Sequence, residues 1–170
     1  MADLRPTIDQ FRGLGHHQTT YDWGISFISL PSLLTGFDSA DLNTRCTSAQ
    51  LQARKINAIE LNLRGHKIYQ HGTVDYGNSI TLNLYETSDQ KVGNFLNAYM
   101  DLQWSPIVGA QIPKSLNQSA FLLTLLDSEN KAKKYYTIIG AWLQGWNEID
   151  LGSDSSVIQY ATQWQFDYYL

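Results

Sequence analysis

The final sixteen residues, Ser155 to Leu170, read SSVIQYATQWQFDYYL. Alternate positions carry large apolar or β-branched side chains, namely Ile158, Tyr160, Thr162, Trp164, Phe166 and Tyr168. The intervening positions are mostly amides, with one acid: Val157, Gln159, Ala161, Gln163, Gln165 and Asp167. A period of two with one apolar face predicts a long, half-buried strand, and aromatic residues suit such a surface. A strand at a chain terminus also predicts a sheet edge that something must cover.

The composition predicts one domain with a substantial core and an unusually uncharged surface. A chain of 170 residues is long enough to bury a core, so we expect a single domain over residues 1–170. Its charged content is 16%, below the quarter or so that is typical. A surface of amides and hydroxyls favours contact with other protein, although a soluble monomer with a polar surface stays an alternative.

The charge pattern disfavours nucleic-acid binding through phosphate contacts. The net charge is −4, and the one tight basic cluster is Lys131, Lys133 and Lys134.

Cys46 is the single cysteine, so no internal disulfide can form, which fits a reducing compartment. The N-terminus lacks the apolar core of a signal peptide, and the densest apolar run, Phe121 to Leu126, is too short to span a membrane. We therefore expect no membrane partner.

Alternation and turn residues divide the chain into strands. We expect strands near residues 21–30, 59–64, 66–71, 80–85, 120–126, 135–142, 146–151 and 155–170, with a hairpin turn at 127–130. Residues 1–20 are predicted to form an N-terminal arm, and 105–117 a loop. Residues 32–53 are predicted to form a long loop with a short strand near 43–46. A loop of that length is either a floppy insertion or an assembly contact.

One helix is predicted after residue 86. Thr87 and Gln90 have the spacing of a capping box, and the apolar positions Val92, Phe95, Leu96, Tyr99 and Met100 follow helical periodicity up to about Trp104. Its apolar stripe should pack on a sheet. The fold class predicted is mainly β, a two-sheet antiparallel sandwich or partial barrel with one flanking α-helix.

The sequence carries no pattern typical of catalysis or metal binding. His66 and His71 are five residues apart, which puts them on opposite faces of one strand, and no Cys or carboxylate cluster accompanies them. Cys46 has no histidine nearby, and nothing singles out Glu60 and Glu86 as an acid–base pair. We therefore expect neither an enzyme nor a cofactor or metal site.

Two stretches resemble the tail tube proteins of contractile-tailed bacteriophages. They are Ala53 to Trp104, which begins with Arg54-Lys55-Ile56-Asn57 before a strand, and Tyr135 to Leu170. The second contains Gly140-Ala141-Trp142, the run NEIDL from Asn147 and the ending Phe166-Asp167-Tyr168-Tyr169. Together they cover about half of the chain. The resemblance implies a tail-tube fold, hexameric rings stacked into a tube, and ejection of DNA through the bore without specific binding.

The resemblance also implies partners and a location. The partners would be further copies of the chain, the contractile sheath, the tape measure protein and the baseplate proteins that initiate the tube. The location would be the tail tube of a virion, assembled from protein made in the host cytoplasm. Related tubes occur in injection systems derived from phages, and the sequence does not separate the two kinds of particle.

Physical reasoning selects candidate residues for these roles. Strand edges joined around a ring are no longer exposed, and a polar, uncharged bore lets DNA slide. Candidates for the bore face are Asn62, Arg64, Thr81 and Asn83, which would otherwise face solvent. The resemblance implies assembly contacts in the N-terminal arm, the 32–53 loop and the end of the last strand, and the candidates there are Phe11, Leu42, Gln163, Gln165, Tyr168 and Tyr169. The alternative function is a small-ligand or glycan-binding β-sandwich with a pocket lined by two or more of Trp23, Trp104, Trp142, Trp146 and Trp164.

Two substitutions in the last strand test its two faces. Trp164→Ala should lower the free energy of unfolding by about 3–5 kcal/mol, the cost of removing a buried aromatic ring. Gln163→Arg, on the opposite face, should leave the monomer folded but weaken assembly. Denaturant titration measures the first effect and sedimentation the second. A Gln163→Arg protein that assembles normally would refute the assignment of that face to an interface.

Overall fold

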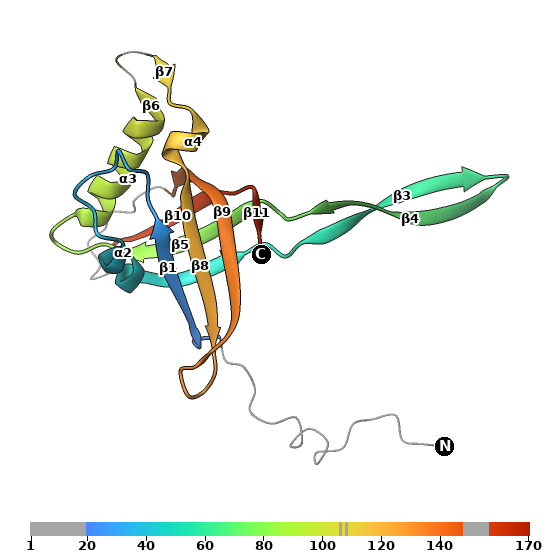
Figure 1. Cartoon of the computed structure of the whole chain (residues 1–170), viewed down its shortest axis with the longest axis horizontal. Coiled ribbons are helices and arrows are strands. Elements are labelled where there is room, and N and C mark those ends of the chain that lie inside the picture. Colours follow the sequence, from blue (N-terminus) through green and yellow to red (C-terminus); the bar gives the residue numbers. More distant parts are fainter. Residues whose placement is uncertain (1–19, 106, 108, 148–156) are drawn as a thin grey trace.

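The computed structural model describes residues 20–105, 107, 109–147 and 157–170. These residues form a mainly β fold of antiparallel strands with helices at its side, and the sheets do not close into a barrel (Figure 1). The strands are β1 (Trp23–Ser29), β2 (Cys46–Leu51), β3 (Lys55–Leu63), β4 (His66–Asp75), β5 (Ser79–Tyr85), β6 (Trp104–Ser105), β7 (Ala110–Gln111), β8 (Ser119–Leu126), β9 (Ala132–Trp146), β10 (Gln159–Gln165) and β11 (Tyr168–Tyr169). The helices are α2 (Ser39–Arg45), α3 (Lys91–Gln103) and α4 (Lys114–Asn117).

The main sheet has the strand order β1-β8-β9-β10-β5-β2, with β11 also paired to β9. The long strand β9 belongs to two layers, because its first half pairs with β8 and β11 and its second half with β10. The change of layer occurs near Gly140, which has φ 71°. The hairpin turn predicted at 127–130 is confirmed, with the Asp127 amide donating to the Lys131 carbonyl at 2.8 Å and Asn130 at φ 57°.

Most of the predicted final strand is β10, which lies in the middle of the sheet and not at an edge as predicted, while the last two ladder residues form β11 at an edge of the other layer. β10 pairs with β5 on one side and with β9 on the other. The chain then breaks at Phe166 and Asp167, and β11 joins the other layer beside Ile138 and Ile139. Among the described strands of the main sheet, β1, β2 and β11 each pair on one side only.

The core lies between the two layers and α3, and Trp164 is its centre. The Trp164 ring makes edge-on contacts with Phe121 of β8 at 4.9 Å, Tyr99 of α3 at 5.2 Å and Phe27 of β1 at 6.2 Å between centroids. Its indole nitrogen donates to the Thr162 hydroxyl at 2.9 Å, which donates in turn to the Leu82 carbonyl at 2.8 Å. The predicted apolar face of this strand is therefore confirmed at its buried positions, Tyr160, Thr162, Trp164 and Phe166.

Two predicted loops contain helices and strands. Residues 32–53 include α2 and β2, so the short strand predicted near 43–46 is present but begins only at Cys46, after the helix. Residues 105–117 include β7 and α4, and β6 ends at Ser105. Helix α2 begins at the N-cap Asp38, whose carboxylate accepts from the Ala40 amide at 2.9 Å. None of the described helices has the length and apolar run needed for a membrane span.

The predicted helix is confirmed as α3, but its predicted capping box is wrong. Gln90 is the N-cap residue, with φ 52° and no capping bond from its side chain. The carboxylate of Glu86 takes that role by accepting from the amides of Gly93 at 2.7 Å and Val92 at 3.3 Å. Val92, Phe95, Leu96 and Tyr99 form the buried face of the helix, as their spacing predicts.

Gly140 is a position where the backbone and its surroundings both disfavour a side chain. It combines φ 71° with an Asp167 carboxylate that occupies the space a Cβ would need. We expect Gly140→Ala to lower the free energy of unfolding by about 1–3 kcal/mol from backbone strain alone. Gly145→Ala is the control in the same strand, because no atom lies within 4 Å of its added Cβ. Urea denaturation of the two variants measures the difference, and equal losses would contradict the assigned bend.

Candidate interaction surfaces

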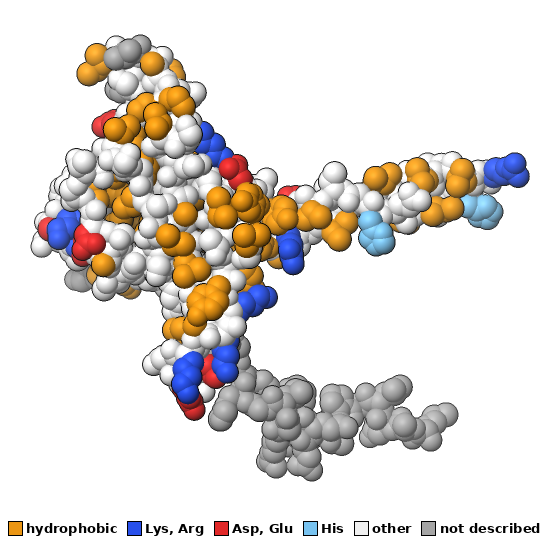
Figure 2. Space-filling view, viewed as in Figure 1, with side chains coloured by type: hydrophobic (Ala, Val, Ile, Leu, Met, Phe, Trp, Pro, Cys, Tyr) orange, Lys and Arg blue, Asp and Glu red, His pale blue; other side chains and the backbone are white. Residues whose placement is uncertain are grey.

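Strands β3 and β4 form a two-stranded arm that leaves the body of the protein (Figures 1 and 2). Every residue of β3 is exposed, as is nearly every residue of β4. Nine residues at about 3.3 Å each give β3 a reach of roughly 30 Å. The β3–β4 arm ends in a turn at Arg64 and Gly65, which have φ 47° and 85° and lie beyond the last pair of the ladder, Leu63 with His66.

The β3–β4 arm has one apolar and one polar face. Leu61 lies opposite Ile68 in the register, and Ile59 and Leu63 share that face. On the other face, Glu60 lies opposite Tyr69 and binds Lys67 in an ion pair of 2.7 Å. Sequence alternation predicts Ile59, Leu61 and Leu63 half-buried, but they are 49%, 37% and 56% exposed. The alternation is real, and no described residue of the chain covers its apolar face.

An isolated two-stranded ribbon is marginally stable in water, and an exposed apolar stripe marks a contact surface. The base of the β3–β4 arm is held by the C-terminal strand: the Tyr169 hydroxyl accepts a hydrogen bond from the Arg54 amide at 2.9 Å. The Tyr169 ring also packs edge-on against Tyr76 and Tyr136. The end of the chain therefore fixes where the arm begins.

A second candidate surface is the outer face of the layer formed by β2, β5 and β10. Its side chains stand in register across the strands, with Gln163 opposite Thr81 and Thr81 opposite Gln50. The next row outward pairs Asn83 with Ser48, whose hydroxyl accepts from the Asn83 amide at 2.7 Å. None of these residues is charged. We call this set the neutral face, and it consists of Ser48, Gln50, Thr81, Asn83, Ala161, Gln163 and Gln165.

The structure separates the predicted bore residues into two groups. Thr81 and Asn83 lie on the neutral face, whereas Asn62 and Arg64 lie at the far end of the β3–β4 arm. Gln163 and Gln165, predicted as assembly contacts, lie on the same neutral face as Thr81. The two predictions therefore describe one continuous surface there, and both roles stay predictions.

The remaining assembly candidates differ in how accessible they are. Leu42 is 3% exposed and packs in the core, and Tyr169 is 8% exposed at the base of the β3–β4 arm. Their side chains are thus occupied by contacts within the chain, while Tyr168 is 41% exposed. Phe11 lies outside the described residues, as does the predicted N-terminal arm except for Thr20. Most of the strand predicted at 146–151 also lies outside them.

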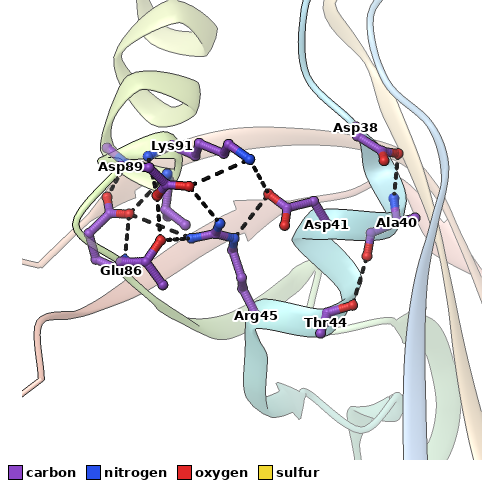
Figure 3. Close-up of polar contacts among 11 residues, drawn as sticks. Asp38, Ala40, Asp41, Thr44, Arg45, Glu86, Asp89 and Lys91 are labelled. Atoms are coloured by element: carbon purple, nitrogen blue, oxygen red, sulfur yellow. Dashed lines mark hydrogen bonds and ion pairs between the residues drawn. The ribbon is translucent and has the colours of Figure 1, made fainter.

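An ionic cluster joins α2 to the start of α3 (Figure 3). Arg45 is at its centre and contacts Asp41 at 3.0 Å and Asp89 at 3.1 Å, with Glu86 at 3.9 Å. Lys91 reaches Asp89 at 3.5 Å and Asp41 at 3.9 Å. Burial opposes the charge on Arg45, but its hydrogen bonds with Asp41 and Asp89 leave its pKa raised. The cluster uses its charges internally, so it serves as a clamp between two helices.

Three features of the described residues bear on the catalytic, metal-binding and ligand-binding alternatives. Burial raises the pKa of the Cys46 thiol to about 12, which removes the thiolate that nucleophilic attack needs. No group of three or more metal-ligating side chains is assembled in the described part of the chain. None of the four cavities described there is lined by two tryptophans, and Trp164 is fully buried.

Solved structures of contractile particles share this fold. A chain in the six-fold symmetrised baseplate of the anti-feeding prophage matches with a TM-score of 0.65 at 12% identity, covering 92% of this chain and 95% of that one. A chain in the anti-feeding prophage cap, which terminates its tube, matches with a TM-score of 0.61 at 12% identity, over 92% and 91% of the two chains.

A third match is a chain in the extended sheath–tube complex of PVC, an extracellular contractile injection system. Its TM-score is 0.59 at 11% identity, with 96% of each chain covered. At such low identity these matches establish the fold. Neither a protein-family model nor a curated protein sequence matches the chain.

The ionic clamp predicts a dependence of stability on pH. The Thr87 hydroxyl and then Arg45 hold the pKa of Asp89 well below its ordinary value. A carboxylate whose pKa is lower in the folded state stabilises that state fully at pH values above its unfolded pKa of about 3.9. This stabilisation is lost as the pH falls from there through the folded pKa. We expect Asp89→Asn to lower the urea midpoint at pH 7, with the difference from wild type shrinking below about pH 4. Asp101→Asn, an exposed position on α3, is the control, and a difference that is constant with pH would contradict the clamp.

Proposed function

We propose that this chain is a structural subunit that polymerises into the inner tube of a contractile, phage-like particle. The observation that carries the proposal is the β3–β4 arm, whose apolar face no other part of the described chain covers. The shared fold with chains of contractile particles agrees with it, over more than nine-tenths of this chain in each match. The protein acts by assembly and has no enzymatic role.

The apolar stripe on the arm is best explained by further copies of the same chain. Burying it removes apolar surface from water and stabilises a ribbon that is marginal alone. The arm reaches roughly 30 Å from the body, which is far enough to lie across a neighbouring subunit. Each copy can donate its own arm to one neighbour and receive the arm of another. Repeated head to tail, this contact forms a closed ring or an open filament.

The free strand edges support ring formation. β1 and β2 each have one unpaired side in the described sheet, and edges left in water favour uncontrolled aggregation. Joining the edges of neighbouring copies around a ring satisfies those backbone groups. We propose hexameric rings stacked into a tube, with the arm as the contact between copies.

The neutral face is our candidate for the bore of the tube. Thr81, Asn83, Gln163 and Gln165 present amides and hydroxyls without charge, so a polyanion gains no affinity from counterion release there. DNA or another polymer can then pass without being retained. In this arrangement Asn62 and Arg64 follow the arm onto the neighbouring copy, and Tyr168 is free for a contact at the end of the chain.

This role places the chain in the tail tube of a virion or a phage-derived particle, made in the host cytoplasm. Its partners are further copies of itself, the contractile sheath, the tape measure protein and the baseplate proteins that initiate the tube. A second candidate role is a ring at the end of the tube, favoured by the matches to chains in a tube-terminating cap and a baseplate.

A charge placed on the apolar face of the arm tests the proposal. Leu61→Glu should abolish rings and tubes in sedimentation and negative-stain microscopy, because a carboxylate would be buried in the contact. Its melting temperature should match wild type, since Leu61 lies outside the core. Asn62→Glu is the matched control, with the same charge one residue along on the polar face. Normal assembly of Leu61→Glu, or a wild type that stays monomeric even with preformed tube ends, would overturn the proposal.

A further inference from the structure

The β3–β4 arm meets the body of the protein where the pairing between its two strands is interrupted. The β2–β5 ladder of the body ends at Leu51, and the β3–β4 ladder of the arm begins at Lys55. Residues 52–54 and, on the returning strand, residues 76–78 lie between the two ladders, and we call them the joint. Because the regular ladder does not run through the joint, other contacts must set the direction in which the arm leaves the body.

The backbone of the joint turns sharply on the returning strand. Gly77 and Asn78 have φ 71° and 53°, in the left-handed region that side chains disfavour. The Gly77 amide donates to the Asp75 carboxylate at 2.8 Å, and a Cβ at Gly77 would lie 2.5 Å from the Cβ of Gln52. The two strands of the joint therefore pass close together, and a change in these few backbone angles is enough to redirect the arm.

The C-terminal segment 166–169 contacts both strands of the joint, at the place where the arm leaves the body (Figure 1). On the returning strand, the Phe166 amide donates to the Asn78 carbonyl at 3.0 Å. On the outgoing strand, the Arg54 amide donates to the Tyr169 hydroxyl at 2.9 Å. The Tyr169 ring also packs edge-on against Tyr76, with 5.7 Å between the ring centroids. The end of the chain therefore holds the joint by both of its strands.

This C-terminal segment is anchored firmly at one end and lightly at the other. Phe166 is 3% exposed in the core. Beyond it, β11 pairs with β9 at two positions, and Leu170 exchanges two backbone hydrogen bonds of 3.0 Å with Thr137. The other side of β11 is unpaired among the described strands. Short edge strands at a chain end are among the parts of a fold that open at the lowest free energy, so the last three residues can open while Phe166 stays in place.

We infer that Tyr168–Leu170 is a latch for the β3–β4 arm: while the latch lies on β9 it fixes the direction of the arm, and when the latch opens the joint lets the arm turn. Tyr169 is a ladder residue of β11 and also the contact with Arg54 and Tyr76, so one opening breaks both. Because Tyr169 is 8% exposed, the closed latch is the dominant state. The inference concerns a single chain, so it holds or fails independently of the proposed assembly.

The latch gives the chain a means of controlling how its arm is presented. An arm that keeps one direction loses less conformational entropy on contact with another surface than an arm that turns freely. A closed latch therefore favours any contact that the apolar face of the arm makes, and an open latch disfavours it.

Distances between two spin labels on the monomer test the latch. In a Cys46→Ser background, labels at Asn62→Cys on the arm and Asn97→Cys on α3 report the direction of the arm by double electron–electron resonance. With the latch intact, the monomer fraction from gel filtration should give one narrow distance distribution. A chain that ends at Asp167 and the full-length Tyr169→Ala variant should each give a broad one, because the joint has lost its hold.

Two controls separate the latch from a general loosening of the fold. Tyr168→Ala removes the neighbouring side chain, which is 41% exposed and points to the opposite face of β11, so it should keep the narrow distribution. A second pair of labels within the body, at Ser26→Cys on β1 and Asn97→Cys, should keep its wild-type distance in every variant.

A broad distribution with the latch intact, or a narrow one in both the shortened chain and Tyr169→Ala, would overturn the inference and leave the proposed function standing. If the pair of labels within the body also broadens in these variants, Tyr169→Phe decides, because it keeps the ring and removes only the acceptor of the Arg54 amide. Its arm distribution should widen while the distance within the body stays unchanged, and an arm distribution as narrow as that of wild type would count against the latch.

Discussion

The buried indole of Trp164 is the contact on which this fold depends. It touches Phe27 and Phe121 of one layer and Tyr99 of α3, while its own strand belongs to the other layer. Edge-on aromatic contacts add to the burial of apolar area, and the indole nitrogen donates to Thr162, so the one polar group of the ring is paired. With the two layers and the helix fixed to one ring, β9 can bend at Gly140 and serve both layers. The outer surfaces are then positioned by a rigid body.

What this rigid body displays is unusual for a protein that works alone. One surface is an arm with an apolar stripe and almost no contact with the body, and another is a sheet face of amides and hydroxyls without charge. Exposing the apolar stripe of the arm to water is unfavourable, and the uncharged sheet face has little affinity for a polyanion. A subunit that joins others through the arm and turns the neutral face toward a passing polymer uses both properties. The ionic clamp around Arg45 holds α2 and α3 in place, and its residues belong to neither of these two surfaces.

The proposed contacts also explain why the C-terminal strand is built in two parts. β10 runs through the middle of the sheet, so its backbone is paired on both sides over Thr162–Gln165 and its polar face is held in register with β5. β11 crosses to the other layer, and Tyr169 there bonds to Arg54 at the base of the β3–β4 arm. The end of the chain thus connects the core, the neutral face and the arm. Among the described strands of the main sheet, β1, β2 and β11 keep one unpaired side, which is open to neighbouring copies.

The sequence by itself determined the mainly β class, helix α3 and the two faces of β10, because period-two and period-3.6 patterns follow directly from backbone geometry. It did not show that the alternating residues Ile59, Leu61 and Leu63 form an exposed arm, since alternation reports a face and not what covers it. It did not place β10 inside the sheet, because strand order depends on pairings between distant segments. The cap by Glu86 and the ionic clamp of the helix at 39–45 likewise arise from contacts that local patterns cannot encode. Only the tertiary structure decided them, because it brings Glu86 over the first amides of α3 and Arg45 of α2 against Asp89.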